Sequence, residues 1–538
     1  MATRPATTMS DRVAILILAG LALVAALTFR DYGLGWDDYT HSEYGDLLLK
    51  LYASGFADTR ALSFVNLYKY GGGFDLAAAL AAKVLPFGLF ETRRLIGAAV
   101  GLIGLFATWR LARRVGGPLA GLAALILLAA CPLYYGHMFI NAKDAPFAVA
   151  MIVLLLGVVR AFDEYPNPSA RSMVLAGVAI GAAFGTRILA VVAAPYVAFG
   201  LLLIVSADVR AVGLREAARR LWHFVSRMLP ALAIAYLIMA LLWPWSIVEP
   251  LNPVRAAIYF DSFFEKPWRE LYQGLAIPVT QMPADYLPRM FAFKLPIVML
   301  VLGLGGLVGM AIAILRRDTA PTRRANFLVI ACAALLPIAV ALVSRPALYN
   351  GIRHFVFLVP PFAVAGGLAA AWAAEWLKAR GRLAQVAAAA TFAAGVALPV
   401  VEMVRLHPYQ YVSYNQIVGG VPGAHDRFML DYWGLAFKQA SEALRAAVDA
   451  RNEAKPQGRP WRVAVCGPQR GPQVALGPDY ETTAEPAGAD FVMSLGAFYC
   501  RVLDAPLVAE IEREGVPFAR VYDIRGRDVG DLLVYRAP

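Results

Sequence analysis

The chain consists mostly of long apolar stretches joined by shorter polar loops. Apolar stretches of roughly 17–25 residues have the length that crosses a hydrocarbon core of about 30 Å. Eleven stretches fit this description, and each predicts a transmembrane helix. They cover residues 13–29, 93–112, 118–136, 145–161, 172–188, 189–206, 229–247, 292–315, 325–343, 354–373 and 383–401. We therefore expect a polytopic α-helical membrane protein.

Lysine and arginine are distributed unevenly among the loops between these stretches. Cytoplasmic loops carry an excess of both residues. If the N-terminus is cytoplasmic, the dense arginine clusters fall inside, at 110–117, 163–172, 208–227, 316–324 and 378–382. The same alternation places the other segments together on the opposite, periplasm-like face. These outer segments are 30–92, 140–146, 185–187, 248–291, 344–354 and everything after Val401.

The first outer segment is too long for a simple turn between two helices. The stretches HSEYGDLLLKLYASG at 41–55 and FDLAAALAAKVLPFG at 74–88 are apolar or amphipathic but shorter than a span. Both are bounded by glycine, which favours helices that lie in the membrane interface. The segment 248–291 is also long and rich in aromatic residues, and we expect it to form a mobile cover. For its Trp268 and Tyr272 an interfacial aromatic belt is the alternative.

After residue 401 the pattern changes, because charges, glycine and proline increase and no further span occurs. Short apolar runs at 462–468 and 491–498 predict buried strands, and 531–536 predicts a closing strand. The segment 443–453 predicts a helix. The chain thus divides into a transmembrane domain, 1–401, and a small soluble α/β domain, 402–538.

Composition agrees with this picture. The chain is 59% hydrophobic and 16% charged, whereas soluble domains are about 25% charged. The net charge of +12 follows from the loop arginines, so we expect no nucleic-acid binding. The four cysteines lack metal-site spacing. Cys466 and Cys500 can pair if their domain faces an oxidising compartment.

Two adjacent carboxylates, Asp37 and Asp38, follow the first apolar stretch in WDDYTHSEYG at 36–45. Charges often only mark the end of a span. In a site shielded from water, however, such a pair resists full ionisation, which raises one pKa and produces a general base. Alternatively, the pair holds a divalent cation through its oxygen atoms.

Further ionisable residues fall on the same face at membrane depth: Lys143, Asp144, Arg187, Arg353 and His354. Such residues are costly there and usually line a cavity. Three cations beside carboxylates suit a ligand that carries phosphate. For each cation alone, an interfacial snorkelling side chain is the alternative. For His354 the alternative is a structural histidine.

These segments resemble the membrane glycosyltransferases of the GT-C fold. The resemblance is to the group of protein O-mannosyltransferases and lipid A aminoarabinose transferases, which take a sugar from a polyprenyl-phosphate carrier. It rests on WDDYTHSEYG, on NAKDAPFA at 141–148 and on GIRHFVFLVPP at 351–361. The stretch 407–434 is similar to bacterial members that carry a C-terminal periplasmic domain.

The resemblance implies a role for each candidate residue. Asp37 would be the general base and Asp38 would orient it. Lys143, Arg187 and Arg353 would stabilise the departing polyprenyl phosphate, with His354 beside them in the substrate site. Asp144 would bind sugar hydroxyls. No cofactor is certain, and a divalent ion, Mg²⁺ or Mn²⁺, would have Asp38 and Asp144 as its candidate ligands.

The implied reaction is an inverting sugar transfer to an envelope glycan, lipid or protein acceptor. The implied location is a bacterial inner membrane, with the C-terminal domain in the periplasm and membrane lipids as neighbours. A transporter or lipid flippase with an intramembrane charged pathway is the alternative function. Against it, the chain shows neither two similar halves nor broken helices at corresponding positions.

Overall fold

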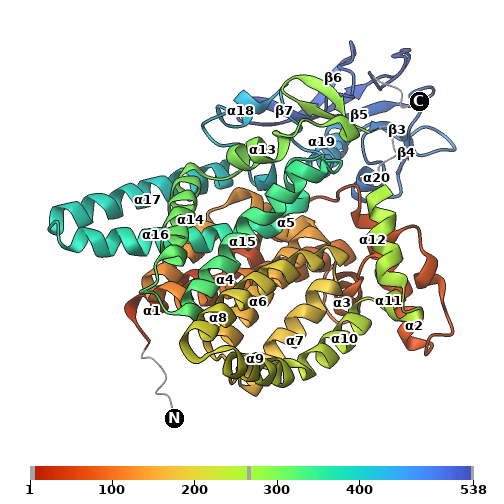
Figure 1. Cartoon of the computed structure of the whole chain (residues 1–538). Helices are drawn as coiled ribbons and strands as arrows, with labels where there is room; N and C mark the ends of the chain where they lie inside the picture. Colours follow the sequence, from red (N-terminus) through yellow and green to blue (C-terminus); the bar gives the residue numbers. More distant parts are fainter. Residues whose placement is uncertain (1–6, 263–267, 535–538) are drawn as a thin grey trace.

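Long helices pack into one bundle, and a small β-sheet, blue in Figure 1, lies at one end of it. The computed structural model describes residues 7–262 and 268–534. Within these residues nine helical segments are long and apolar enough to cross a membrane. The chain is therefore a polytopic helical membrane protein, as expected, while the count of eleven spans stays a prediction.

The longer helices follow the apolar stretches of the sequence. They are α1 (Met9–Thr28), α4 (Leu89–Ala129), α6 (Asp144–Asp163), α7 (Ala170–Phe184), α8 (Ala193–Val212), α9 (Leu214–Met228), α10 (Pro230–Leu242), α14 (Ile297–Leu315), α15 (Pro321–Ser344), α16 (Val359–Lys378) and α17 (Arg382–Arg405). Shorter helices and turns are α5 (Pro132–Ile140), α11 (Trp245–Val248), α12 (Asn252–Ser262), α13 (Tyr286–Lys294) and α18 (Gly420–Ala424), with 3₁₀ turns η1 (Arg60–Ser63), η2 (Leu67–Lys69), η3 (Ile188–Val192), η4 (Val279–Gln281), η5 (Arg353–Leu358) and η6 (Gln410–Val412).

Helix α4 contains two of the predicted spans, 93–112 and part of 118–136. Its backbone breaks at Gly117, where φ is 85° and the next residue is Pro118. Glycine accepts this left-handed angle without strain, and the proline ring cannot continue the preceding hydrogen-bond ladder. Gly117 and Pro118 therefore divide α4 into two helical parts that follow each other without a loop.

The first outer segment forms two short helices, α2 (Asp38–Ala53) and α3 (Gly73–Ala81). The predicted helices are confirmed, while their place in the membrane interface stays a prediction. Buried ion pairs fix both of them to the start of α4. Arg93 donates to Asp75 of α3 over 2.5 Å, and the same carboxylate lies 2.6 Å from the ring of His41 on α2. The two helices are thus anchored by charge as well as by apolar packing.

The C-terminal sheet has five strands in the order β4-β3-β5-β7-β6. Strands β3 (Trp461–Cys466), β4 (Tyr480–Thr483) and β5 (Phe491–Leu495) are parallel, whereas β6 (Leu507–Arg513) and β7 (Val516–Asp523) form an antiparallel hairpin. Helix α19 (Phe437–Ala450) packs on the sheet, and α20 (Arg470–Leu476) joins β3 to β4. The α/β class of this region and strands near 462 and 491 are confirmed.

One predicted strand is wrong. In the range 531–536 the described residues contain a single bridge, between Leu533 and Cys500, and residues 535 and 536 lie outside the described part of the chain. A bridge of one residue pair is too short to add a strand to the sheet. A disulfide joins Cys466 at the end of β3 to Cys500 in the loop after β5.

The segment between α17 and α19 is bound tightly to the helices. The buried Lys294 of α13 donates hydrogen bonds to the backbone carbonyls of Val412 and Ser413, both over 3.1 Å. Asn415 donates to the carbonyls of Ala292 and Leu295 over 2.6 and 2.7 Å. This segment, 406–436, therefore belongs to the common hydrophobic core, and the division at residue 401 stays a prediction.

The long outer segment 248–291 follows α11 and contains α12, a hairpin of β1 (Arg269–Tyr272) and β2 (Leu275–Pro278), and most of α13. Residues 263–267 of the predicted cover lie outside the described residues, and the cover itself stays a prediction. Tyr272 is 3% exposed and packs on Tyr286 and Phe428. It is therefore a core residue, and the aromatic-belt alternative is wrong for it.

Candidate functional site

All seven predicted site residues line one cavity of about 270 Å³. Its wall includes residues from each of the six segments that the sequence places on the outer face. These wall residues include Asp37, Lys143, Arg187, Trp268, Arg353 and Trp433. The structure therefore brings together the residues that the topology argument groups on one side.

Asp37 lies immediately before α2, with its side chain 48% exposed and Oδ2 4.0 Å from a guanidinium nitrogen of Arg353. Desolvation by burial alone would raise the pKa of this carboxyl. The positive charges of Lys143 and Arg353 outweigh it and hold the pKa of Asp37 below its ordinary value. The expected rise of one pKa in the pair is therefore not found at Asp37, because the charges of Lys143 and Arg353 outweigh its desolvation. The role of Asp37 as general base stays a prediction.

Asp38 is 3% exposed and has a different environment. Arg94 of α4 donates to its two carboxylate oxygens over 2.8 and 2.5 Å, and the backbone N–H of Gly35 donates to Oδ2 over 2.7 Å. This bidentate pair fixes the start of α2 and hence the position of Asp37. We therefore propose a positioning role for Asp38.

The cations around Asp37 come from different elements. Lys143 precedes α6, and its ammonium lies 4.4 Å from the ring centre of Tyr70. Arg187, between α7 and η3, forms an ion pair with Asp144 over 2.8 Å. Asp144 also accepts a hydrogen bond from the amide of Asn141 over 2.9 Å. Desolvation by burial lowers the pKa of Lys143, and the negative charge of Asp37 acts in the opposite direction.

Arg353 begins η5 and lies between two aromatic rings, 4.8 Å from Tyr349 and 4.9 Å from Trp433. His354 packs edge-on against Tyr349 at 4.9 Å. The buried Nε atoms of Arg187 and Arg353 have no hydrogen-bond partner among the described residues. Buried donors of this kind normally find an acceptor, so the cavity offers unused donors to an anionic ligand.

The two candidate metal ligands, Asp38 and Asp144, do not fit a divalent metal. Both oxygens of Asp38 are paired with Arg94, and Asp144 is held by Arg187 and Asn141. Within residues 7–262 and 268–534, no three histidine, cysteine or acidic side chains are grouped closely enough to hold an ion. We therefore derive no step through a metal.

Sequence reasoning missed several residues that build the cavity. Arg94 lies at the start of an apolar stretch and was not singled out. Two consecutive arginines at the end of a span, after a segment that contains several acids, could have indicated buried ion pairs. Trp433 enters from the C-terminal segment because Gly35 has no side chain. A Cβ at Gly35 would lie 1.5 Å from the Trp433 ring. Contacts this distant in sequence have no local pattern.

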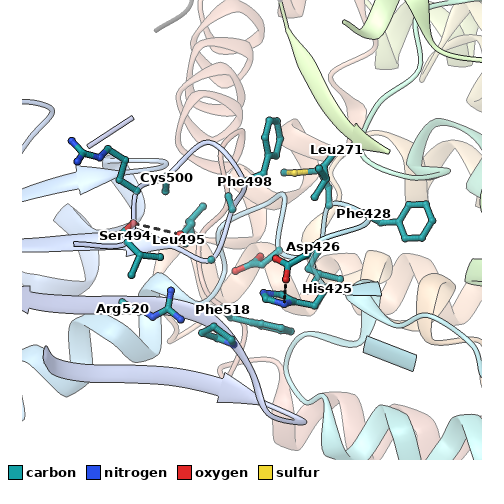
Figure 2. Close-up of a pocket in the computed structure, with 18 residues that line it drawn as sticks. Leu271, His425, Asp426, Phe428, Ser494, Leu495, Phe498, Cys500, Phe518 and Arg520 are labelled. Atoms are coloured by element: carbon teal, nitrogen blue, oxygen red, sulfur yellow. Dashed lines mark hydrogen bonds and ion pairs between the residues drawn. The ribbon is translucent and has the colours of Figure 1, made fainter. Parts of the chain in front are cut away.

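A second cavity, of about 250 Å³, lies between the sheet and the segment 425–431 (Figure 2). Leu271 of β1, Phe428 and Phe518 line it, together with Arg520, which pairs with Glu510 over 2.5 Å. It contains none of the predicted site residues. The chemistry expected from the sequence therefore belongs to the first cavity.

Comparison with known proteins gives matches to membrane transferases. Residues 74–245 match the model of a family described as dolichyl-phosphate-mannose-protein mannosyltransferase. No curated protein sequence matches the chain. The apo structure of ArnT from Cupriavidus metallidurans is similar at 15% identity and TM-score 0.50, over 94% of this chain and 97% of that chain.

Two further solved structures are similar at lower scores. ArnT from the same organism, bound to undecaprenyl phosphate, is 16% identical with TM-score 0.48, over 94% of this chain and 97% of that chain. The apo oligosaccharyltransferase from Archaeoglobus fulgidus is 13% identical with TM-score 0.46, over 89% of this chain. The chain spans 65% of the length of that oligosaccharyltransferase.

The likeness to apo ArnT extends over nearly the whole of both chains and shows the fold. The chain has the fold of the GT-C membrane glycosyltransferases, and the resemblance seen in its sequence is confirmed. Neither these matches nor the described part of the fold supports the transporter alternative.

Proposed function

We propose that the chain is an inverting glycosyltransferase that moves a sugar from a polyprenyl phosphate to an acceptor at the outer face of a bacterial inner membrane. One observation carries the proposal: a carboxylate and three cations from separate outer segments face a single cavity. The family matched by residues 74–245 is described by a lipid-phosphate sugar, which fits this charge pattern. The Cys466–Cys500 disulfide supports a periplasmic C-terminal domain.

In this proposal Asp37 accepts the proton of the acceptor hydroxyl or amine. The acceptor atom forms a bond to the anomeric carbon as the bond from that carbon to the phosphate oxygen breaks. The electron pair leaves with the polyprenyl phosphate, and attack opposite the leaving group inverts the anomeric carbon. The lowered pKa keeps Asp37 ionised at neutral pH and so ready to accept the proton.

Lys143, Arg187 and Arg353 stabilise the phosphate as negative charge accumulates on it. The unpartnered Nε donors of the two arginines fit its oxygens. Asp144 holds Arg187 in place through their ion pair, and in this proposal it also accepts hydrogen bonds from the sugar hydroxyls. His354, packed on Tyr349 beside Arg353, lines the same substrate site.

Transfer of radiolabelled sugar tests the proposal directly. Purified protein is incubated with a panel of polyprenyl-phosphate sugars and a membrane extract as the source of acceptors, with and without chelator. The proposal is supported if the wild-type protein transfers sugar to an acceptor from one of these donors. No transfer from any donor, together with substrate uptake or lipid flipping in liposomes, would overturn it.

Replacing Arg353 by alanine should weaken use of the lipid donor more than binding of the acceptor. A hydrogen bond to a charged group contributes about 1.5–3 kcal/mol, so the donor KM should rise by roughly 10- to 100-fold. The exposed Arg289 pairs only with a neighbouring exposed carboxylate, and Arg289→Ala serves as the matched control. Equal loss for donor and acceptor would contradict a phosphate role.

Replacing Lys143 by methionine should change the pH dependence of transfer. The charge of Lys143 lowers the pKa of Asp37, whereas desolvation raises it. Without that charge the pKa of Asp37 should therefore rise. Because the ionised carboxylate is the active form, the acid limb of kcat/KM against pH should move to higher pH. Lys50→Met, at an exposed lysine on α2, should leave the limb in place. An unchanged limb in Lys143→Met would show that Lys143 does not act on the base.

A further inference from the structure

Glu270 is a buried carboxylic acid that the proposed reaction does not use. It lies in β1 and is 3% exposed. Successive residues of a strand point to opposite faces, and its neighbour Leu271 lines the second cavity (Figure 2). Trp268, just before the strand, lines the first cavity. Strand β1 therefore lies between the two cavities, with Glu270 inside the wall.

Glu270 contacts the loop that leads to Arg353. The hydroxyl of Tyr286, which is fully buried, donates to Oε1 of Glu270 over 3.3 Å. The same hydroxyl accepts a hydrogen bond from the backbone N–H of Gly351 over 3.0 Å. The backbone N–H groups of Asn350 and Gly351 also favour the ionised form of Glu270. Glu270 and Tyr286 thus hold two consecutive backbone groups of this loop.

The loop contains a turn whose backbone is left-handed at two successive residues. The angle φ is 57° at Asn350 and 65° at Gly351. Glycine adopts this conformation without strain, and asparagine adopts it more readily than other non-glycine residues, so the surrounding contacts fix which turn forms. Arg353 follows two residues after the turn. A change in the turn would therefore move the guanidinium that faces Asp37.

We propose that Glu270 is a positioning residue, which with Tyr286 holds the left-handed turn at Asn350 and Gly351 and thereby fixes Arg353 in the cavity. It touches neither donor nor acceptor and acts through the backbone. The inference rests on the proposed function only where it links Arg353 to a lipid phosphate. The positioning itself is a property of the fold.

The charge of Glu270 adds a pH dependence to this contact. Burial raises its pKa to about 7, so both protonation states are populated near neutral pH. An ionised carboxylate accepts stronger hydrogen bonds than a neutral one, and the turn should be held more firmly as pH rises through 7. The groups that face Glu270 are Tyr286 and Lys294 of α13, Arg353 of η5, and Tyr414, Tyr432 and Tyr499 from the C-terminal part.

Hydrogen exchange of the peptide that covers 348–356 tests the positioning without any substrate. In the purified full chain, Glu270→Ala should raise exchange of this peptide by about tenfold or more after correction for intrinsic rates. Glu270→Gln keeps an acceptor oxygen and should remain near the wild type at pH 6, where the wild-type carboxyl is mostly neutral. Glu43→Ala, at an exposed acid of α2, is the matched control. In the wild type, protection should increase between pH 6 and 8, and Glu270→Gln should lose that increase.

Binding of undecaprenyl phosphate separates this inference from the proposed function. Glu270→Ala should weaken binding of undecaprenyl phosphate by about tenfold. Glu270→Gln should bind it as tightly as the wild type does at pH 6. Changed exchange in a protein whose wild type binds no undecaprenyl phosphate would support the positioning role and count against the proposed function. Unchanged exchange in Glu270→Ala, or a flat pH dependence in the wild type, would overturn the inference. If Glu270→Ala does not fold, the pH series of the wild type and Glu270→Gln decides.

Discussion

Sugar transfer should fall by roughly 10²–10⁴-fold when Asp37 is replaced by asparagine, which is the usual contribution of a general base. Asparagine has nearly the same size and keeps one oxygen, but it cannot accept the proton. The side chain of Asp37 is about half exposed and makes no hydrogen bond that caps the start of α2. Expression and thermal unfolding should therefore stay close to the wild type, while initial rates of radiolabelled transfer fall.

Glu43→Gln makes the matched comparison for this variant. Glu43 is an exposed acid on the same helix and does not line the cavity. Its loss should leave the rate of transfer unchanged. If Asp37→Asn retains full transfer, another group accepts the proton and our assignment of the base is wrong.

Replacing Arg94 by alanine should reduce stability strongly. Arg94 is 2% exposed and forms the bidentate pair with Asp38, and it also donates to the carbonyl of Gly33 over 2.5 Å. Breaking a buried pair leaves one uncompensated charge and costs about 3–5 kcal/mol. The measurement is the midpoint of thermal unfolding in detergent. A lower midpoint should accompany loss of transfer, because the start of α2 also places Asp37.

An exposed pair provides the control for this loss. Arg30 lies 3.8 Å from Glu91 with more than half of its side chain exposed, and Arg30→Ala should change stability by less than about 1 kcal/mol. Adding Asp38→Asn to Arg94→Ala removes the uncompensated charge and should recover part of the loss. A double variant less stable than Arg94→Ala would contradict this account.

The location of the candidate site could be predicted because it follows from topology. Loop arginines assign each loop to a face, and that assignment puts Asp37, Lys143, Arg187 and Arg353 on one side. The membrane then confines these residues to one layer. What the pattern cannot give is which side chains pair, because pairing depends on how helices far apart in sequence pack. Arg94 with Asp38 is an example.

The C-terminal sheet shows a second limit. Strands β3 and β5 are buried on both faces, so continuous apolar runs predict them. Strand β6 is an edge strand whose residues are mostly half-exposed, and LVAEIER has no apolar run to mark it. Glu270 was missed for a related reason. A single acid in a polar loop looks solvent-exposed until the loop is folded onto its neighbours.

The cavity is assembled from residues that extend from Asp37 near the start of the chain to Trp433 in the segment that follows α17. During synthesis the ribosome delivers Asp37 first and Trp433, which packs against Arg353, last. A partly made chain already inserted in the membrane therefore has the acidic group but lacks a closed site.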